Sequence, residues 1–283
     1  MSSSRSSFLA FSSCALLGCL VLVGAGCTGG GSRPTPTPSD PTAIFGDPSA
    51  TTSTPAEPVG MGCDHEYYPL RMGYHIQYET TYPASSGISG SAHYALNVRR
   101  VTPTSVYLTS AFERSTGSAG GSVQSNVEYR CIGGALAAAG YVNMGPGSAG
   151  SADRIGEIHT NSSEGEFLPQ HIVPGAQWAS TFNVTMTLPA TPDPMSGTAT
   201  PIPPIDMNVA IKRHAIRLER VRVPAGEYEA MKIETVTLID DHPATNATEW
   251  WVKDVGMVKT TLDAGSGVQD IVTVATGVTV PNP

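Results

Sequence analysis

The chain has 283 residues and a formal net charge of −8 at pH 7, from 16 basic and 24 acidic side chains. This mildly acidic, evenly spread charge argues against a nucleic-acid partner and against a basic face that docks on membranes. The 30 glycines and 23 prolines are typical of a chain with many turns, and helical periodicity is nearly absent.

Residues 1–26 have the plan of a signal peptide. Arg5 is the single charged side chain of this segment, and a mainly apolar run follows it from Phe8 to Val23. A spanning helix needs about 20 consecutive apolar residues held by charged flanks. Small residues and a Thr/Gly/Pro stretch follow here instead. We therefore expect the segment to be cleaved and the protein to be exported.

The end of this segment, Val23-Gly24-Ala25-Gly26-Cys27, resembles a lipobox, in which small residues precede a cysteine that receives a diacylglyceryl group. We expect Cys27 to carry lipid, although lipoboxes usually have leucine three residues before the cysteine. Cys19 fits that position better, but cleavage there would leave Leu20–Val23 exposed behind the lipid. Cleavage without lipidation and retention of the segment as an anchor are two further outcomes. Two or more acyl chains anchor stably, so the protein would lie outside the cytoplasm on the cell membrane or the outer membrane.

Residues 27–60 form a Pro/Thr/Ser/Gly-rich stretch with almost nothing to bury. Such a segment cannot offset the entropy of ordering and stays extended. We expect it to be a tether between the lipid and a β domain at residues 61–283.

The cysteines are accounted for by this scheme. Cys14 and Cys19 leave with the signal peptide, and Cys27 is acylated. Cys63 and Cys131 then remain as thiols in an oxidising compartment, where one disulfide between them is the simplest outcome. Two separate buried thiols are the alternative. In the chain-entropy description, closing a loop of this length stabilises by about 4 kcal/mol.

The rest of the chain alternates apolar and polar residues and is rich in β-branched and aromatic side chains, which predicts strands. The predicted strands are Tyr74–Thr81, His93–Val101, Ser105–Phe112, Ser125–Cys131, Trp178–Leu188, Val209–Val223, Tyr228–Asp240, Thr248–Lys253, Gly256–Leu262 and Gln269–Val280. We predict an all-β fold, an antiparallel barrel or a half-barrel or sandwich of about 9 to 10 strands.

Three local patterns refine this prediction. Gly133–Gly140 is interpreted as a hairpin and the start of a further strand, and the proline-rich Pro189–Pro204 as a long loop between two halves. The two halves open alike, because Gly73 and Gly175 each stand three residues before a large apolar side chain that opens a strand.

Four segments resemble uncharacterised bacterial envelope lipoproteins of the TapB-like β-domain group. They are Cys63–Gly73, Val127–Gly134, Val223–Ala230 and Trp250–Lys259. The resemblance spans most of residues 63–262 and implies an antiparallel barrel or half-barrel, and its strand with a central cysteine supports the disulfide. The chain departs from the group at Ile76 and Asp254. The group brings no catalytic residues that could be carried over.

Motifs of catalysis and metal binding are absent from the sequence. There is no GxSxG, HExxH or P-loop, and no GxGxxG after a predicted strand. Asp64-His65-Glu66 and Asp240-Asp241-His242 lack a paired ligand on the same element, so neither is taken as a metal site. We expect no cofactor.

The remaining candidates are aromatic. Trp178, Tyr228, Trp250 and Trp251 could line a ligand cavity, but Trp250 and Trp251 must face opposite sides of one strand. Packing in the core is the alternative role of the inward ring. The first functional hypothesis is a non-enzymatic β domain that binds a protein partner or surface at the envelope. The second is a carrier of a lipid or small apolar ligand in the barrel interior, and the third is a hydrolase.

Overall fold

The computed structural model describes residues 63–82, 91–114, 122–141, 157–187, 191–192, 199–200, 202–263 and 270–282. The expected signal peptide, Cys27 and the tether lie outside these residues. In the described ranges no helix is long and apolar enough to cross a membrane.

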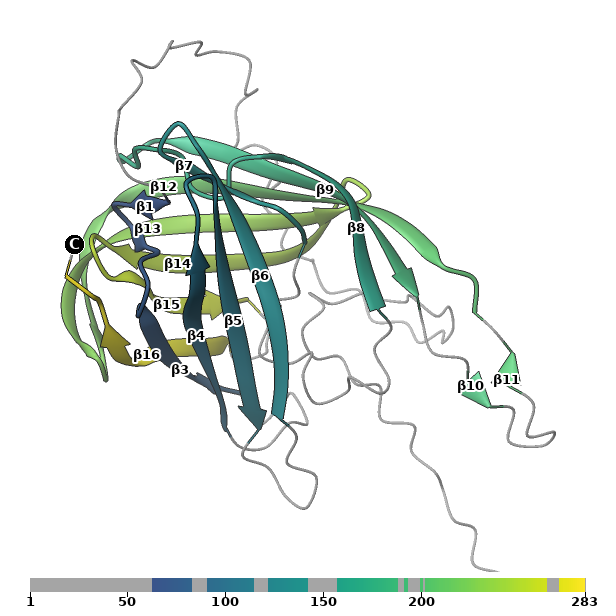
Figure 1. Ribbon diagram of the computed structural model, residues 1–283, viewed down its shortest axis with the longest axis horizontal. Helices are drawn as coiled ribbons and strands as arrows, with labels where there is room; N and C mark the ends of the chain where they lie inside the picture. The colour runs from purple at the N-terminus through teal and green to yellow at the C-terminus, as the bar shows by residue number, and fades with distance from the viewer. Residues whose placement is uncertain are drawn as a thin grey trace, which may run out of the picture.

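One antiparallel sheet of twelve strands dominates the protein and curls into a nearly closed barrel (Figure 1). Its strands, in chain order, are β3 (His75–Thr81), β4 (Ser91–Val101), β5 (Ser105–Arg114), β6 (Ser122–Ile132), β7 (Ala135–Ala138), β8 (Glu157–Gly165), β9 (Gln177–Thr187), β12 (Ile205–Val223), β13 (Gly226–Ile239), β14 (His242–Val252), β15 (Gly256–Leu262) and β16 (Ile271–Thr279). The all-β antiparallel prediction is therefore confirmed.

The order of strands across the sheet is β7-β6-β5-β4-β3-β16-β15-β14-β13-β12-β9-β8. The first and last strands of this order, β7 and β8, come together because Leu136 on β7 bridges Leu168 just after β8. Two backbone hydrogen bonds support the bridge, from Leu136 N–H to the Leu168 carbonyl (2.8 Å) and from Leu168 N–H to the Leu136 carbonyl (3.0 Å). The edges of the sheet are thus partly paired with each other.

Two segments of the structure differ in detail from the prediction. The sequence pattern does not predict strand β8, because its residues, EIHTNSSEG, lack apolar alternation; as an outer strand it leaves most of its side chains exposed. Within the predicted proline-rich loop, β10 (Thr191–Pro192) and β11 (Ala199–Thr200) form a separate two-stranded sheet.

The two halves of the barrel begin in the same way. Gly73 and Gly175 both have φ of 88°, and the residue after each glycine donates its N–H over 3.0 Å to the carbonyl three residues back. This is the type II turn, in which glycine accepts the positive φ. The neighbouring strand then forms a backbone hydrogen bond to the residue after the glycine, from Val98 of β4 in the first half and from Ala215 of β12 in the second. In both strands a β-bulge follows directly.

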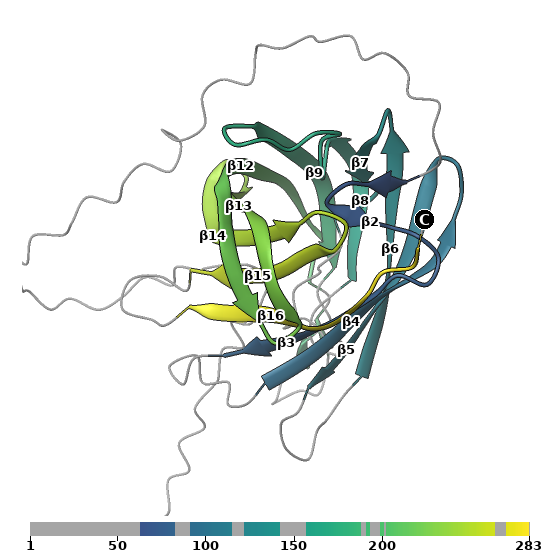
Figure 2. The ribbon, with the colours of Figure 1, turned by 90° about the vertical axis from the view of Figure 1, so that its left-hand side faces the viewer.

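Residues 63–74 cross one end of the barrel, and we call them the plug. They include the short hairpin of β1 (Asp64–His65) and β2 (Tyr68–Pro69), which lies at the end where the C-terminus is found (Figures 1 and 2). Cys63 forms a disulfide with Cys131 on β6, with their Cα atoms 5.1 Å apart. Tyr67, Tyr68 and Leu70 are buried beneath. The plug is therefore part of the core.

The turn between β14 and β15 holds the plug from the other side. Asp254 N–H donates to the Glu66 carbonyl (2.7 Å), and Lys253 pairs with the Glu66 carboxylate at 3.0 Å. Asp254 has φ of 58°, a left-handed conformation that Asp and Asn tolerate better than most residues. The departure of Asp254 from the TapB-like pattern thus lies at a turn position with a special backbone.

Candidate functional site

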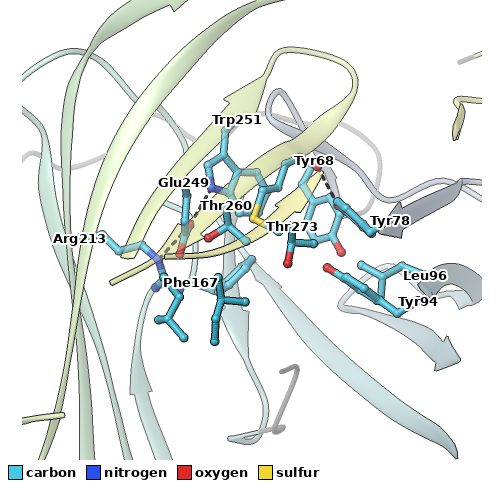
Figure 3. Close-up of a pocket in the computed structure, with 13 residues that line it drawn as sticks. Tyr68, Tyr78, Tyr94, Leu96, Phe167, Arg213, Glu249, Trp251, Thr260 and Thr273 are labelled. Carbon is cyan, nitrogen blue, oxygen red and sulfur yellow. Dashed lines mark hydrogen bonds and ion pairs between the residues drawn. The ribbon is translucent and has the colours of Figure 1, made fainter. Parts of the chain in front are cut away.

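A cavity of about 210 Å³ lies inside the barrel beneath the plug (Figure 3). Its walls are mainly aromatic and aliphatic, with one arginine, one glutamate and two threonines. The lining residues are Tyr68, Tyr78, Tyr94, Leu96, Phe167, Arg213, Glu249, Trp251, Met257, Thr260, Leu262, Ile271 and Thr273.

The cavity runs along the barrel, away from the plug. Tyr68 belongs to the plug itself. Leu262, the last residue of β15, pairs with Ile271, the first residue of β16, at the other end of the barrel. Both of these aliphatic side chains are only half-buried. The wall is therefore partly open to solvent at the end remote from the plug.

The aromatic wall is built from rings in contact. Tyr78 and Tyr94 stack with centroids 4.4 Å apart, and Trp251 meets Tyr68 edge-on at 5.6 Å and Phe167 at 5.9 Å. Such contacts add about 0.5–1.5 kcal/mol beyond area burial. The Tyr78 hydroxyl donates to the Met257 carbonyl (2.7 Å).

These tyrosines present no charge to the cavity. Burial raises the pKa of Tyr68, Tyr78 and Tyr94 well above the ordinary value for tyrosine. Neighbouring tyrosines raise the pKa of Tyr68 and Tyr78 further, whereas a hydrogen bond with Tyr78 opposes the shift of the Tyr94 pKa. Their hydroxyl groups therefore stay neutral at any physiological pH.

The one charged feature of the wall is the pair of Arg213 on β12 and Glu249 on β14. Arg213 Nε lies 3.8 Å from Glu249 Oε2, and the exposed fractions of the two side chains are 6% and 13%. Glu249 also accepts hydrogen bonds from Thr235 Oγ1 (3.1 Å) and Trp251 Nε1 (2.8 Å). The glutamate is thus held by two neutral donors besides the arginine.

Arg213 has fewer hydrogen-bond partners than Glu249. Its guanidinium carbon lies 4.9 Å from the centroid of the Phe167 ring, a cation–π contact. Neither Nε nor Nη1 makes a hydrogen bond to any described residue. A buried arginine with unused donors is unusual, because each unmade bond of a buried polar group costs about 1–3 kcal/mol.

Sequence reasoning missed Arg213 and Glu249, although the signal was present. Along β12, Val209 and Ala215 are buried on the face that also carries Arg213. Alternation alone therefore assigns this arginine to the inner face. Glu249 follows from the same rule, two residues before Trp251 on β14.

The four aromatic residues named from the sequence are placed differently from one another. Trp251 lines the cavity. Trp178 is half-buried and donates its indole N–H to the Phe167 carbonyl (3.0 Å), and Tyr228 donates to a carbonyl within the β12–β13 turn (2.9 Å). Trp250 faces the outside of the barrel, and none of these three is among the lining residues.

The two histidine-containing motifs have structural roles. His65 is buried, with Nε2 2.7 Å from the Pro169 carbonyl and Nδ1 accepting the Tyr67 N–H at 3.1 Å. Asp240 and Asp241 have φ of 48° and 65° and form the tight β13–β14 turn. Over the described ranges, no group of three or more His, Cys, Asp or Glu is arranged to hold a metal.

Comparisons with known proteins give a family likeness over part of the chain. A sequence model described as DUF3108-like matches residues 182–262, which include the turn motif at Val223–Ala230 and the tryptophan motif at Trp250–Lys259. No curated protein matches the chain.

Two solved structures are similar to this chain. One is a Bacteroides fragilis protein described as exported and as having a YmcC-like fold, with 14% identity, a TM-score of 0.45 and coverage of 74% of this chain and 96% of that one. The other, from Parabacteroides distasonis, is described as a lipoprotein, with 17% identity, a TM-score of 0.46 and coverage of 76% and 99%.

Proposed function

We propose that this protein is a non-enzymatic envelope lipoprotein, anchored through Cys27, whose barrel binds a small and largely apolar ligand. The observation that carries the proposal is the cavity, in which Trp251, Phe167 and stacked tyrosine rings enclose space beside the Arg213–Glu249 pair. Mainly apolar walls with a few polar groups are typical of ligand sites. A narrower kinship with the TapB-like group is part of the same proposal.

The size of the cavity limits the ligand. Sites for drug-sized molecules usually measure about 300–1,000 Å³, whereas this cavity measures about 210 Å³. It suits a short-chain molecule, or one end of a longer chain that leaves the cavity past Leu262 and Ile271, at the end remote from the plug.

The path of the chain supports a role at the envelope. The proposed tether ends at residue 60, and the described chain starts at Cys63 in the plug. The half-open part of the cavity wall lies at the other end of the barrel. A domain tethered at its plug would hold this opening away from the point of attachment.

A protein partner on the outer surface has less support. Trp250, the outward aromatic residue, is only 8% exposed. Lys232 and Lys259 lie over its ring, with Nζ atoms 5.9 and 4.5 Å from the ring centroid. Partner interfaces prefer accessible aromatic side chains, so we favour the interior of the barrel as the binding site.

The test uses the mature chain with C27S, purified without detergent, and 1-octanol as a neutral apolar ligand. Binding is measured by isothermal titration calorimetry, and native mass spectrometry reports any co-purified molecule. We expect binding by this protein and loss of binding in T260W, because Thr260 lines the cavity. The matched control is T261W on the neighbouring position of β15, where the side chain points to the other face. A protein that binds neither 1-octanol nor a charged analogue of the same chain length, and shows a clean apo mass, would overturn the proposal.

A further inference from the structure

Arg213 is the residue of the cavity whose chemistry is least used by the protein itself. It stands on a wall of rings and aliphatic side chains, and only 6% of its side chain is exposed. Burying a guanidinium is costly unless acceptors replace the lost water. Nε and Nη1 find none among the described residues.

Glu249 orients this guanidinium without satisfying it. The contact of 3.8 Å from Arg213 Nε to Glu249 Oε2 is an ion pair that is too long for a hydrogen bond. Trp251 Nε1 is much closer to the same oxygen, at 2.8 Å, and Thr235 Oγ1 donates to the other. The carboxylate is therefore occupied by neutral donors, and the buried Nε and Nη1 of Arg213 have no acceptor among the described residues.

The Phe167 ring limits where the guanidinium of Arg213 can lie. With the guanidinium carbon 4.9 Å from the ring centroid, Arg213 is confined between the ring and Glu249, as Figure 3 shows. A guanidinium held in this way suits a carboxylate oxygen as the acceptor of its hydrogen bonds. The neutral tyrosine hydroxyls on the far side of the cavity add no competing charge.

We infer that the ligand of this cavity carries a carboxylate, which Arg213 receives, with an apolar chain lying along Trp251, Phe167 and the tyrosine rings. This inference rests on the proposed function and specifies its ligand class as short-chain carboxylic acids or the carboxyl end of a longer acyl chain. Glu249 acts as a positioning residue for the arginine.

The direct test compares three ligands of one chain length on the C27S protein. Octanoate should bind about tenfold or more tightly than 1-octanol, because a hydrogen bond to a charged group contributes that much, and octylamine should bind least. Equal affinities for octanoate and 1-octanol would overturn the carboxylate inference while leaving the proposed function standing. Binding of neither would overturn the proposed function instead.

Variants locate the preference. R213M should remove the preference for octanoate and keep binding of 1-octanol, whereas R217M, on the same strand but with a largely exposed side chain, should retain it. R213K keeps the charge without the fork and should retain only part of the preference. A preference unchanged in both Arg213 variants would overturn the inference.

A measurement on the unmutated cavity avoids any question of folding. The carboxyl of [1-¹³C]octanoate is titrated by NMR, free and bound to the protein. A guanidinium partner lowers the pKa of the bound carboxyl, whereas an apolar cavity alone raises it by desolvation. A lowered pKa supports the inference, and a raised pKa overturns it.

Discussion

Trp250 and Trp251 are consecutive residues on β14 that serve opposite faces of the barrel wall. Trp251 lines the cavity and donates its indole N–H to Glu249 (2.8 Å). Trp250 lies outside, where its indole N–H donates to Glu219 (2.7 Å). This hydrogen bond is the main cause of the lowered pKa of Glu219. The period-2 alternation of a strand therefore places one ring at the cavity and the other on the outer face of the barrel wall.

The two rings should respond differently to a ligand. On addition of 1-octanol, the tryptophan fluorescence of the wild-type domain should change, because Trp251 exchanges its surroundings for the ligand. W250F should keep this change, and W251F should lose it. A change that persists in W251F and disappears in W250F would place the ligand outside the barrel.

The fold was largely predictable from the sequence, but the site was predictable only in part. The strands around Gly73, Gly175 and Trp251 follow from alternation and turn residues, which are local signals. Strand β8 could not be predicted in this way, because an outer, polar strand carries no such pattern. The inward position of Arg213 follows from the alternation of β12. Its neighbour Glu249 is on another strand, however, and only the register of β12, β13 and β14 brings the two together.

Removal of the disulfide should destabilise the domain without changing its topology. Cys63 and Cys131 are 68 residues apart in sequence, which corresponds to about 4 kcal/mol in the chain-entropy description. The double variant C63S/C131S should lose about this free energy of unfolding in urea denaturation. The wild-type protein unfolded with and without reductant is the control, and equal stability of the two wild-type samples would contradict the prediction.

Gly256 should tolerate no side chain. Its φ is 113°, and an added Cβ would meet the Tyr74 hydroxyl oxygen at 2.5 Å, where that hydroxyl donates to the Val255 carbonyl. G256A should therefore lower the free energy of unfolding by about 1–3 kcal/mol. Gly277 is the matched control, because its nearest neighbour is the flexible end of Gln77 at 3.2 Å. G277A should cost distinctly less, and equal losses would argue against strain at Gly256.

Membrane attachment should depend on one cysteine. C27S removes the proposed lipid site, so the protein should move from the membrane fraction to the soluble envelope fraction. C19S is the control and should leave the protein on the membrane, because this residue is expected to be removed with the signal peptide. Retention of the C27S protein on the membrane would contradict the proposed anchor.

The stability of the plug should fall as the pH is lowered, through His65. Burial is the largest cause of the lowering of the His65 pKa from 6.5. The Nδ1 atom that would take the proton already accepts the Tyr67 N–H. Below about pH 6.5, His65 is therefore protonated in the unfolded chain but still neutral in the folded chain. The folded state consequently loses stability as the pH falls toward the lowered pKa.

Urea denaturation between about pH 7.5 and about pH 5.5 measures this effect. The free energy of unfolding of the wild-type protein should decline across this range more steeply than that of H65Q, which has no titrating group at the position. H242Q serves as the control, because His242 is exposed and is not among the groups that shift the pKa of His65, and should follow the wild-type slope. Since His65 also links the plug to the Pro169 carbonyl (2.7 Å), its protonation would loosen the segment that covers the cavity. An H65Q protein with the wild-type slope would remove His65 as the source of the pH dependence.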